Sequence, residues 1–136
     1  MTIDDAIREI QGKSAGITGR ATVEYAQKQL REGEKVFAAA SANIQAHRGN
    51  FPGLIVFTDQ RLFAASGLPG VRCLISLPLR ELISCKDRKT PLSYSVTAAT
   101  RTDSFTAMLS PQAGGNFAPY ISALAGAVKK RYALGT

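Results

Sequence analysis

The sequence predicts an α+β domain that is mainly β: a seven-stranded antiparallel sandwich or barrel with a helical extension before it and a capping helix after it. Short apolar runs separated by turn residues fill the middle of the chain, whereas helical spacing of apolar residues marks its two ends. The chain has 136 residues, 45% of them apolar. That length and composition suit a domain with its own core and exclude intrinsic disorder.

Two helices are expected before the first strand. Thr2 and Asp5 have the spacing of a capping box, and apolar residues follow at helical intervals. Gly33 is expected to end the second helix. The predicted elements of this extension, residues 1–34, are a helix over about 3–11, a glycine-rich connector over 12–19 and a helix over about 20–32.

Residues 35–136 are expected to form the sheet domain. Its clearest hairpin is the apolar run Leu54–Thr58, the turn Asp59-Gln60 and a returning strand. Pro78 is expected to break a later strand, since proline cannot donate to a sheet ladder. The predicted strands cover about residues 36–46, 54–58, 61–66, 71–77, 79–86, 92–100 and 104–109, with a loop over 47–53 and a charged turn over 87–91.

A C-terminal helix is predicted to cover an open edge or mouth of the sheet. Asn116 is the expected N-cap, Pro119 lies in the expected first turn, and the cations of 129–131 suit the helix C-terminus. The helix presents one wide apolar stripe: Phe117, Tyr120, Ile121, Leu124, Ala125 and Val128.

No catalytic, metal or cofactor site is expected. His47 is the sole histidine, and no nucleophile is spaced to work with it. Cys73 and Cys85 are predicted to be buried free thiols on successive strands, near enough to be neighbours, in a reducing compartment. The chain start lacks the features of a signal peptide, and no apolar run approaches about 18 residues. We therefore expect a cytoplasmic protein. Because no catalytic set is present, we also expect that it is not an enzyme.

The segment Gly53–Phe63 resembles the apolar run followed by Thr-x-x-Arg-Leu in the hairpin of bacterial pleckstrin-homology-like (PH-like) domains, in particular the YokE-like group. Leu30-x-x-x-Glu34-x-Val36 resembles the lead-in of that group, a helix that ends just before the first strand. The resemblance covers about residues 20–132. It implies two nearly orthogonal antiparallel sheets capped by the final helix, and it implies little about a ligand.

The resemblance has one departure that bears on ligand binding. Phosphoinositide-binding PH domains place a Lys and an Arg-x-Arg across their first two strands. Here the first loop offers only His47 and Arg48, and the second predicted strand has no basic residue. Specific phosphoinositide recognition is therefore not expected.

The net charge of +7 is unevenly distributed. Residues 1–34 hold five basic and six acidic residues, or −1, whereas residues 35–136 hold twelve basic and four acidic residues, or +8. Such a surface favours anionic partners, but the charge alone does not identify them. The leading hypothesis is a non-catalytic interaction module that acts through protein contacts, including self-association. The alternative is weak, non-specific binding to anionic membrane surfaces.

The candidate contacts to an anion or lipid are six basic residues in or near the predicted turns. Simple up-and-down strand order would group Arg48 with those near the charged turn, whereas the family layout would group Arg48, Arg72 and Arg101. Nucleic-acid binding is not favoured, because no recognition helix and no interleaving of aromatic with basic residues is present. The six candidates are Arg48, Arg72, Lys86, Arg88, Lys89 and Arg101.

Overall fold

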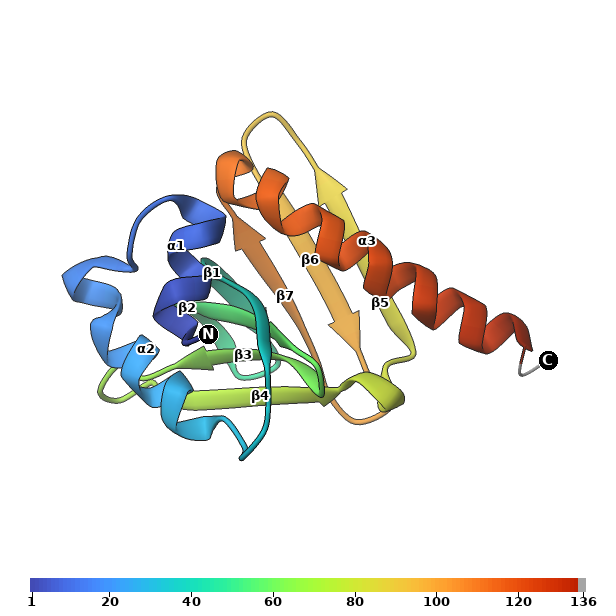
Figure 1. Ribbon diagram of the computed structural model, residues 1–136, viewed down its shortest axis with the longest axis horizontal. Helices are drawn as coiled ribbons and strands as arrows, with labels where there is room; N and C mark the ends of the chain where they lie inside the picture. Colours follow the sequence, from blue (N-terminus) through green and yellow to red (C-terminus); the bar gives the residue numbers. More distant parts are fainter. Residues whose placement is uncertain (135–136) are drawn as a thin grey trace.

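In the computed structural model, seven antiparallel strands form one continuous, bent sheet that is closed on one side by a long helix (Figure 1). The structure describes residues 1–134, without the side chains of residues 17, 18 and 132–134. The strand order is β4-β3-β2-β1-β7-β6-β5. The elements are α1 (Ile3–Gln11), α2 (Gly16–Gln29), β1 (Val36–Ala46), β2 (Gly49–Thr58), β3 (Arg61–Ser66), β4 (Cys73–Pro78), the 3₁₀ turn η1 (Leu79–Glu81), β5 (Ser84–Lys89), β6 (Tyr94–Ala99), β7 (Ser104–Leu109) and α3 (Pro111–Leu134).

The long strand β1 joins the two halves of the sheet. It pairs with β2 along its whole length and with β7 over Asn43–Ala46. In Figure 1, β2, β3 and β4 therefore run across β5, β6 and β7. This arrangement matches the two crossed layers that the resemblance implied, although the layers belong to one sheet.

The N-terminal helices cover the outer face of β1–β4. The capping box of Thr2 and Asp5 is present, and α1 buries Ile3, Ala6, Ile7 and Ile10. With both faces of the sheet covered, β3 is buried at all six positions, and Leu54–Thr58 of β2 is buried throughout. The dense apolar run of this hairpin thus reflects burial on both faces, which removes the usual alternation.

Helix α2 departs from the sequence prediction at both ends. It begins at Gly16, inside the predicted connector, and ends at Gln29. Gly33 follows only after an extended Leu30, and it adopts the left-handed backbone conformation with φ of 77°. This turn returns the chain to the sheet and brings Glu34 against the β2–β3 hairpin.

Two stretches predicted as loops belong to strands. Strand β2 begins at Gly49, so only His47 and Arg48 form the turn from β1. Pro52 is tolerated because it lies beyond the end of β3, where β2 has a free edge. Strand β5 occupies Ser84–Lys89 rather than 79–86, and its charged residues suit the free edge of a sheet.

Helix α3 begins earlier than predicted. The Ser110 hydroxyl accepts a hydrogen bond from the Ala113 amide at 3.2 Å, so Ser110 and not Asn116 caps the helix. A Cβ at Gly114 would clash with the Tyr94 side chain, so glycine here lets the first turns pack against β6. Asn116 lies inside the helix and donates to the Ile10 carbonyl at 2.8 Å. Pro119 is likewise interior.

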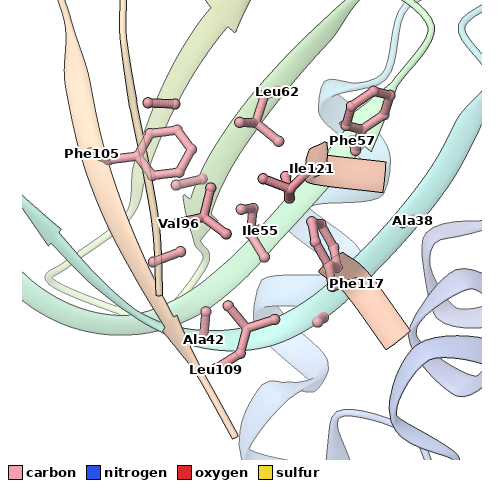
Figure 2. Close-up of a cluster of buried hydrophobic side chains, with 14 of the residues drawn as sticks. Ala38, Ala42, Ile55, Phe57, Leu62, Val96, Phe105, Leu109, Phe117 and Ile121 are labelled. Atoms are coloured by element: carbon pink, nitrogen blue, oxygen red, sulfur yellow. The ribbon is translucent and has the colours of Figure 1, made fainter. Parts of the chain in front are cut away.

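The predicted capping role of α3 is confirmed. Figure 2 shows Phe117 and Ile121 reaching from α3 toward Ile55, Leu62 and Val96 across the bent sheet. Four members of the predicted stripe are buried, whereas Tyr120 is 36% exposed and Ala125 is half-buried; the buried ones are Phe117, Ile121, Leu124 and Val128.

Candidate functional site

Two turns and one strand meet around a hollow of about 560 Å³ at one end of the sheet. The β1–β2 turn contributes His47 and Arg48, and the β6–β7 turn contributes Arg101. Strand β4 supplies Leu74 and Ile75 as an apolar wall. The site follows from strand register: Ala46 of β1 pairs with Phe105 of β7, which brings the two turns side by side.

The two arginines of this hollow carry unpaired charges. Arg48 and Arg101 are both exposed, and neither side chain has an ion pair or hydrogen bond within the described part of the chain. Hydrogen bonds close the β6–β7 turn: the Asp103 amide donates to the Thr100 hydroxyl at 3.1 Å, and the Thr100 amide donates to the Asp103 carbonyl at 2.8 Å. Asp103 is the one acidic residue among those lining the hollow.

The other four candidates lie elsewhere. Arg72, in the β3–β4 loop, has its guanidinium 5.4 Å from the centre of the Tyr25 ring on α2. Lys86, Arg88 and Lys89 are exposed along the edge strand β5. Lys89 pairs with Tyr94, at the opposite end of β6 from the β6–β7 turn. Five of the six basic residues therefore form two separate groups, Arg48 with Arg101 at the hollow and the three cations of β5 on the edge strand, and Arg72 belongs to neither.

A buried ion pair links the N-terminal segment to the β2–β3 hairpin. The Arg61 guanidinium donates to Glu34 from Nε to Oε2 at 2.9 Å and from Nη2 to Oε1 at 3.1 Å, and the two side chains are 3% and 0% exposed. Arg61 also donates to the Gln29 carbonyl at 2.7 Å and to the Ser76 hydroxyl at 3.2 Å. It lies 4.6 Å from the centre of the Phe63 ring.

Thr58 completes this network. Its hydroxyl donates to Glu34 Oε2 at 2.6 Å and accepts the Arg61 amide at 3.1 Å. Burial by itself raises the pKa of Glu34, but hydrogen bonds from Arg61, the Arg31 amide and Thr58 outweigh it and hold the pKa below its ordinary value. Thr58, Arg61 and Glu34 are the polar residues of the two motifs that carried the family resemblance. Their side chains are engaged with one another in the interior, so they stabilise the fold rather than face a ligand.

A second, partly buried polar contact joins β5 to β6. The Tyr94 hydroxyl donates to Asp87 Oδ2 at 2.8 Å, and burial together with this bond raises the Tyr94 pKa. Burial, with a contribution from the Asp87 charge, raises the pKa of Cys85 to about 11. Cys73 and Cys85 are buried free thiols, as predicted, but their strands lie at opposite ends of the strand order and do not pair.

The described residues contain no group of three or more His, Cys, Asp or Glu placed to hold a metal ion. No helix within that part of the chain is long and apolar enough to span a membrane. The sequence did not single out the large exposed side chains: Phe37 at 41%, Val71 at 45%, Ile83 at 40% and Leu92 at 89%. Phe37 lies at the register shift of β1 and the other three lie in connections between elements, and neither location has a sequence signal of its own.

Comparison with known proteins bears on the fold. A scan against models of protein families gives no match, and a search of curated proteins gives none. Among solved structures, the Vps36 N-terminal PH domain is similar, with a TM-score of 0.54 and 16% sequence identity over 76% of this chain and 86% of that chain. The chain has a PH-like fold. At this identity the likeness describes architecture alone.

Proposed function

We propose that this PH-like domain is a non-catalytic interaction module that binds an acidic segment of a protein partner at the hollow between the β1–β2 and β6–β7 turns. The observation that carries the proposal is the pair of uncompensated arginines, Arg48 and Arg101, on the rim of a concave surface. His47 and Ser104 add polar groups with no hydrogen-bond partner among the described residues, and both are free to contact a carboxylate.

The composition of the hollow sets the strength of binding. Two arginines against Asp103 leave a net charge of +1 with His47 neutral. Exposed charges interact weakly and are screened over about 8 Å at physiological ionic strength. Binding should therefore be weak, sensitive to salt, and directed to carboxylate-rich segments rather than to one stereospecific ligand.

We further propose that the acidic segment can belong to another copy of the chain, in which case the hollow mediates self-association. The N-terminal segment carries six acidic residues, and Glu9 and Glu32 are exposed. Opposite charges on the two segments favour a head-to-tail contact, which is salt-sensitive for the same reason as above.

Sedimentation velocity over a concentration series, at low and at high salt, tests self-association. A dimer that dissociates with salt, and that is lost in Arg48→Glu/Arg101→Glu, is the expected result. Lys129→Glu/Lys130→Glu is the matched control, since it reverses the same charge on an exposed part of α3. A monomer at every concentration and salt refutes self-association, and binding of an acidic peptide by that monomer would still support the wider proposal.

A second function, contact with anionic membrane surfaces, is favoured by the exposed cations Lys86, Arg88 and Lys89 of β5. Each cation close to an anionic leaflet contributes on the order of 1 kcal/mol.

We also propose that the chain is a bacterial protein of the YokE-like group with a cytoplasmic location. Residues 1–34 would form a helical extension and residues 35–136 the PH-like domain. The protein is proposed to have no enzymatic activity and no cofactor. Nucleic acid is not a proposed partner.

A further inference from the structure

The tip of the β5–β6 hairpin exposes an apolar residue to solvent. Leu92 is 89% exposed, more than the other large apolar side chains of the described residues. Its neighbour Pro91 is exposed as well. The tip is held in place: the Thr90 amide donates to the Ser93 carbonyl at 2.9 Å, and the Thr90 hydroxyl accepts the Ser93 amide at 3.1 Å and the Leu92 amide at 3.3 Å. A fixed turn therefore presents Pro91 and Leu92 outward.

Cations flank this tip on both faces of the hairpin. Successive strand residues point to opposite faces, so Arg88 lies on one face and Lys89 on the other. Lys86 shares the face of Arg88 two residues farther back. All three are exposed and have no ion pair among the described residues. The one carboxylate of the strand, Asp87, is engaged by the Tyr94 hydroxyl.

We infer that the β5–β6 hairpin is a membrane-contact element that inserts Leu92 into an anionic lipid surface while Arg88 and Lys89 meet the phosphate and carboxylate headgroups. In a lipid bilayer the charged headgroups lie outside the apolar layer of acyl chains. An apolar tip with cations behind it on both faces complements this arrangement. Lys89 and Arg88 are three and four residues before Leu92 in the chain, so both cations directly precede the tip. An acidic protein would complement the cations and leave Leu92 in water.

This contact leaves the arginine hollow accessible. The hairpin tip lies beside the start of α3, and the β6–β7 turn lies at the opposite end of the same strands (Figure 1). One flat membrane cannot contact both ends at once. A chain bound through the hairpin would thus present Arg48 and Arg101 away from the lipid. The inference names the contact residues of the membrane function proposed above and depends on that function.

Single tryptophan reporters test which end inserts, because the chain has no tryptophan of its own. Leu92→Trp places a reporter at the hairpin tip. Val71→Trp places a matched one at an exposed apolar position in the β3–β4 loop, near the hollow end. Each is titrated with vesicles of phosphatidylcholine containing about 30% phosphatidylserine, and with pure phosphatidylcholine vesicles, at low salt. Circular dichroism verifies that both variants fold.

The expected result is a blue shift of Leu92→Trp emission with the anionic vesicles, quenching by lipids brominated on the acyl chain, and neither effect for Val71→Trp. In co-sedimentation, Leu92→Ser should weaken binding about tenfold and Arg88→Ser/Lys89→Ser more than tenfold. A shift of Val71→Trp alone would overturn the inference and assign membrane contact to the hollow end. Co-sedimentation without an emission shift in either tryptophan variant would refute insertion of the hairpin tip, while surface binding of the protein to the vesicles would stand. No co-sedimentation refutes the membrane function itself.

Discussion

Replacing Glu34 by Gln should destabilise the fold by about 3 kcal/mol. The carboxylate is fully buried, accepts two hydrogen bonds from Arg61 and one from Thr58, and neutralises a guanidinium that is itself 3% exposed. The glutamine keeps the shape and one acceptor, but it leaves the Arg61 charge unpaired in the interior. Removing one partner of such a pair costs about 3–5 kcal/mol. The isosteric change should fall at the lower end of this range.

Urea unfolding followed by far-ultraviolet circular dichroism measures this loss, and thermal unfolding should show a fall in Tm of roughly 10 °C. Glu24→Gln is the control, because the Arg20–Glu24 pair is 3.5 Å apart and largely exposed, and it should show no measurable change. In the double variant Glu34→Gln/Arg61→Met, the loss should be smaller than the sum of the single losses.

The pH dependence supplies an independent readout. The pKa of Glu34 is lower in the folded chain than its ordinary value of 4.5, so its contribution is fully present above that pH and is lost as the pH falls through and below it. The acid-sensitive part of the stability should shrink in Glu34→Gln. A loss below 1 kcal/mol, with an unchanged acid profile, would refute the structural role of the pair.

Further expected outcomes concern buried apolar residues, a close glycine contact, a buried thiol and the exposed His47. Leu124→Ala and Ile7→Ala should each lower the free energy of unfolding by about 2–5 kcal/mol in urea titrations, and parent-like stability would show that α3 or α1 is not docked. Gly114→Ala should cost about 1–3 kcal/mol, since its Cβ clashes with the Tyr94 side chain; an unchanged midpoint would contradict this packing. Cys85, with its pKa raised to about 11, should react with a disulfide reagent at pH 8 only after denaturation. His47→Ala should leave unfolding unchanged, and a specific turnover lost in this variant would refute the absence of enzymatic activity.

Local patterns predicted most of the fold. The capping box of α1, the β2–β3 hairpin and the buried stripe of α3 all depend on residues close in sequence, and each is found where expected. Where the prediction failed, the deciding contact was distant. Asn116 has the properties of an N-cap, but Ser110 caps the helix because Gly114 lets the earlier turns pack on Tyr94.

The candidate site was predictable in part. The family layout correctly grouped Arg48 with Arg101, since strand order alone fixes which turns meet. The same layout also grouped Arg72 with them, but Arg72 does not line the hollow, because its guanidinium lies over Tyr25 on α2. Glu34 and Arg61 both belong to the motifs of the family resemblance, but they are 27 residues apart, and nothing in the sequence indicates that they pair with each other in the interior.

The central claim is that the hollow between the β1–β2 and β6–β7 turns binds acidic protein segments. Titration of the ¹⁵N-labelled protein with hexaglutamate, followed by amide chemical shifts at low salt, tests it most directly. We predict perturbations centred on residues 46–49 and 99–104, which are abolished by Arg48→Glu/Arg101→Glu and reduced by added salt. Perturbations centred on β5, or none at any peptide concentration, would contradict it.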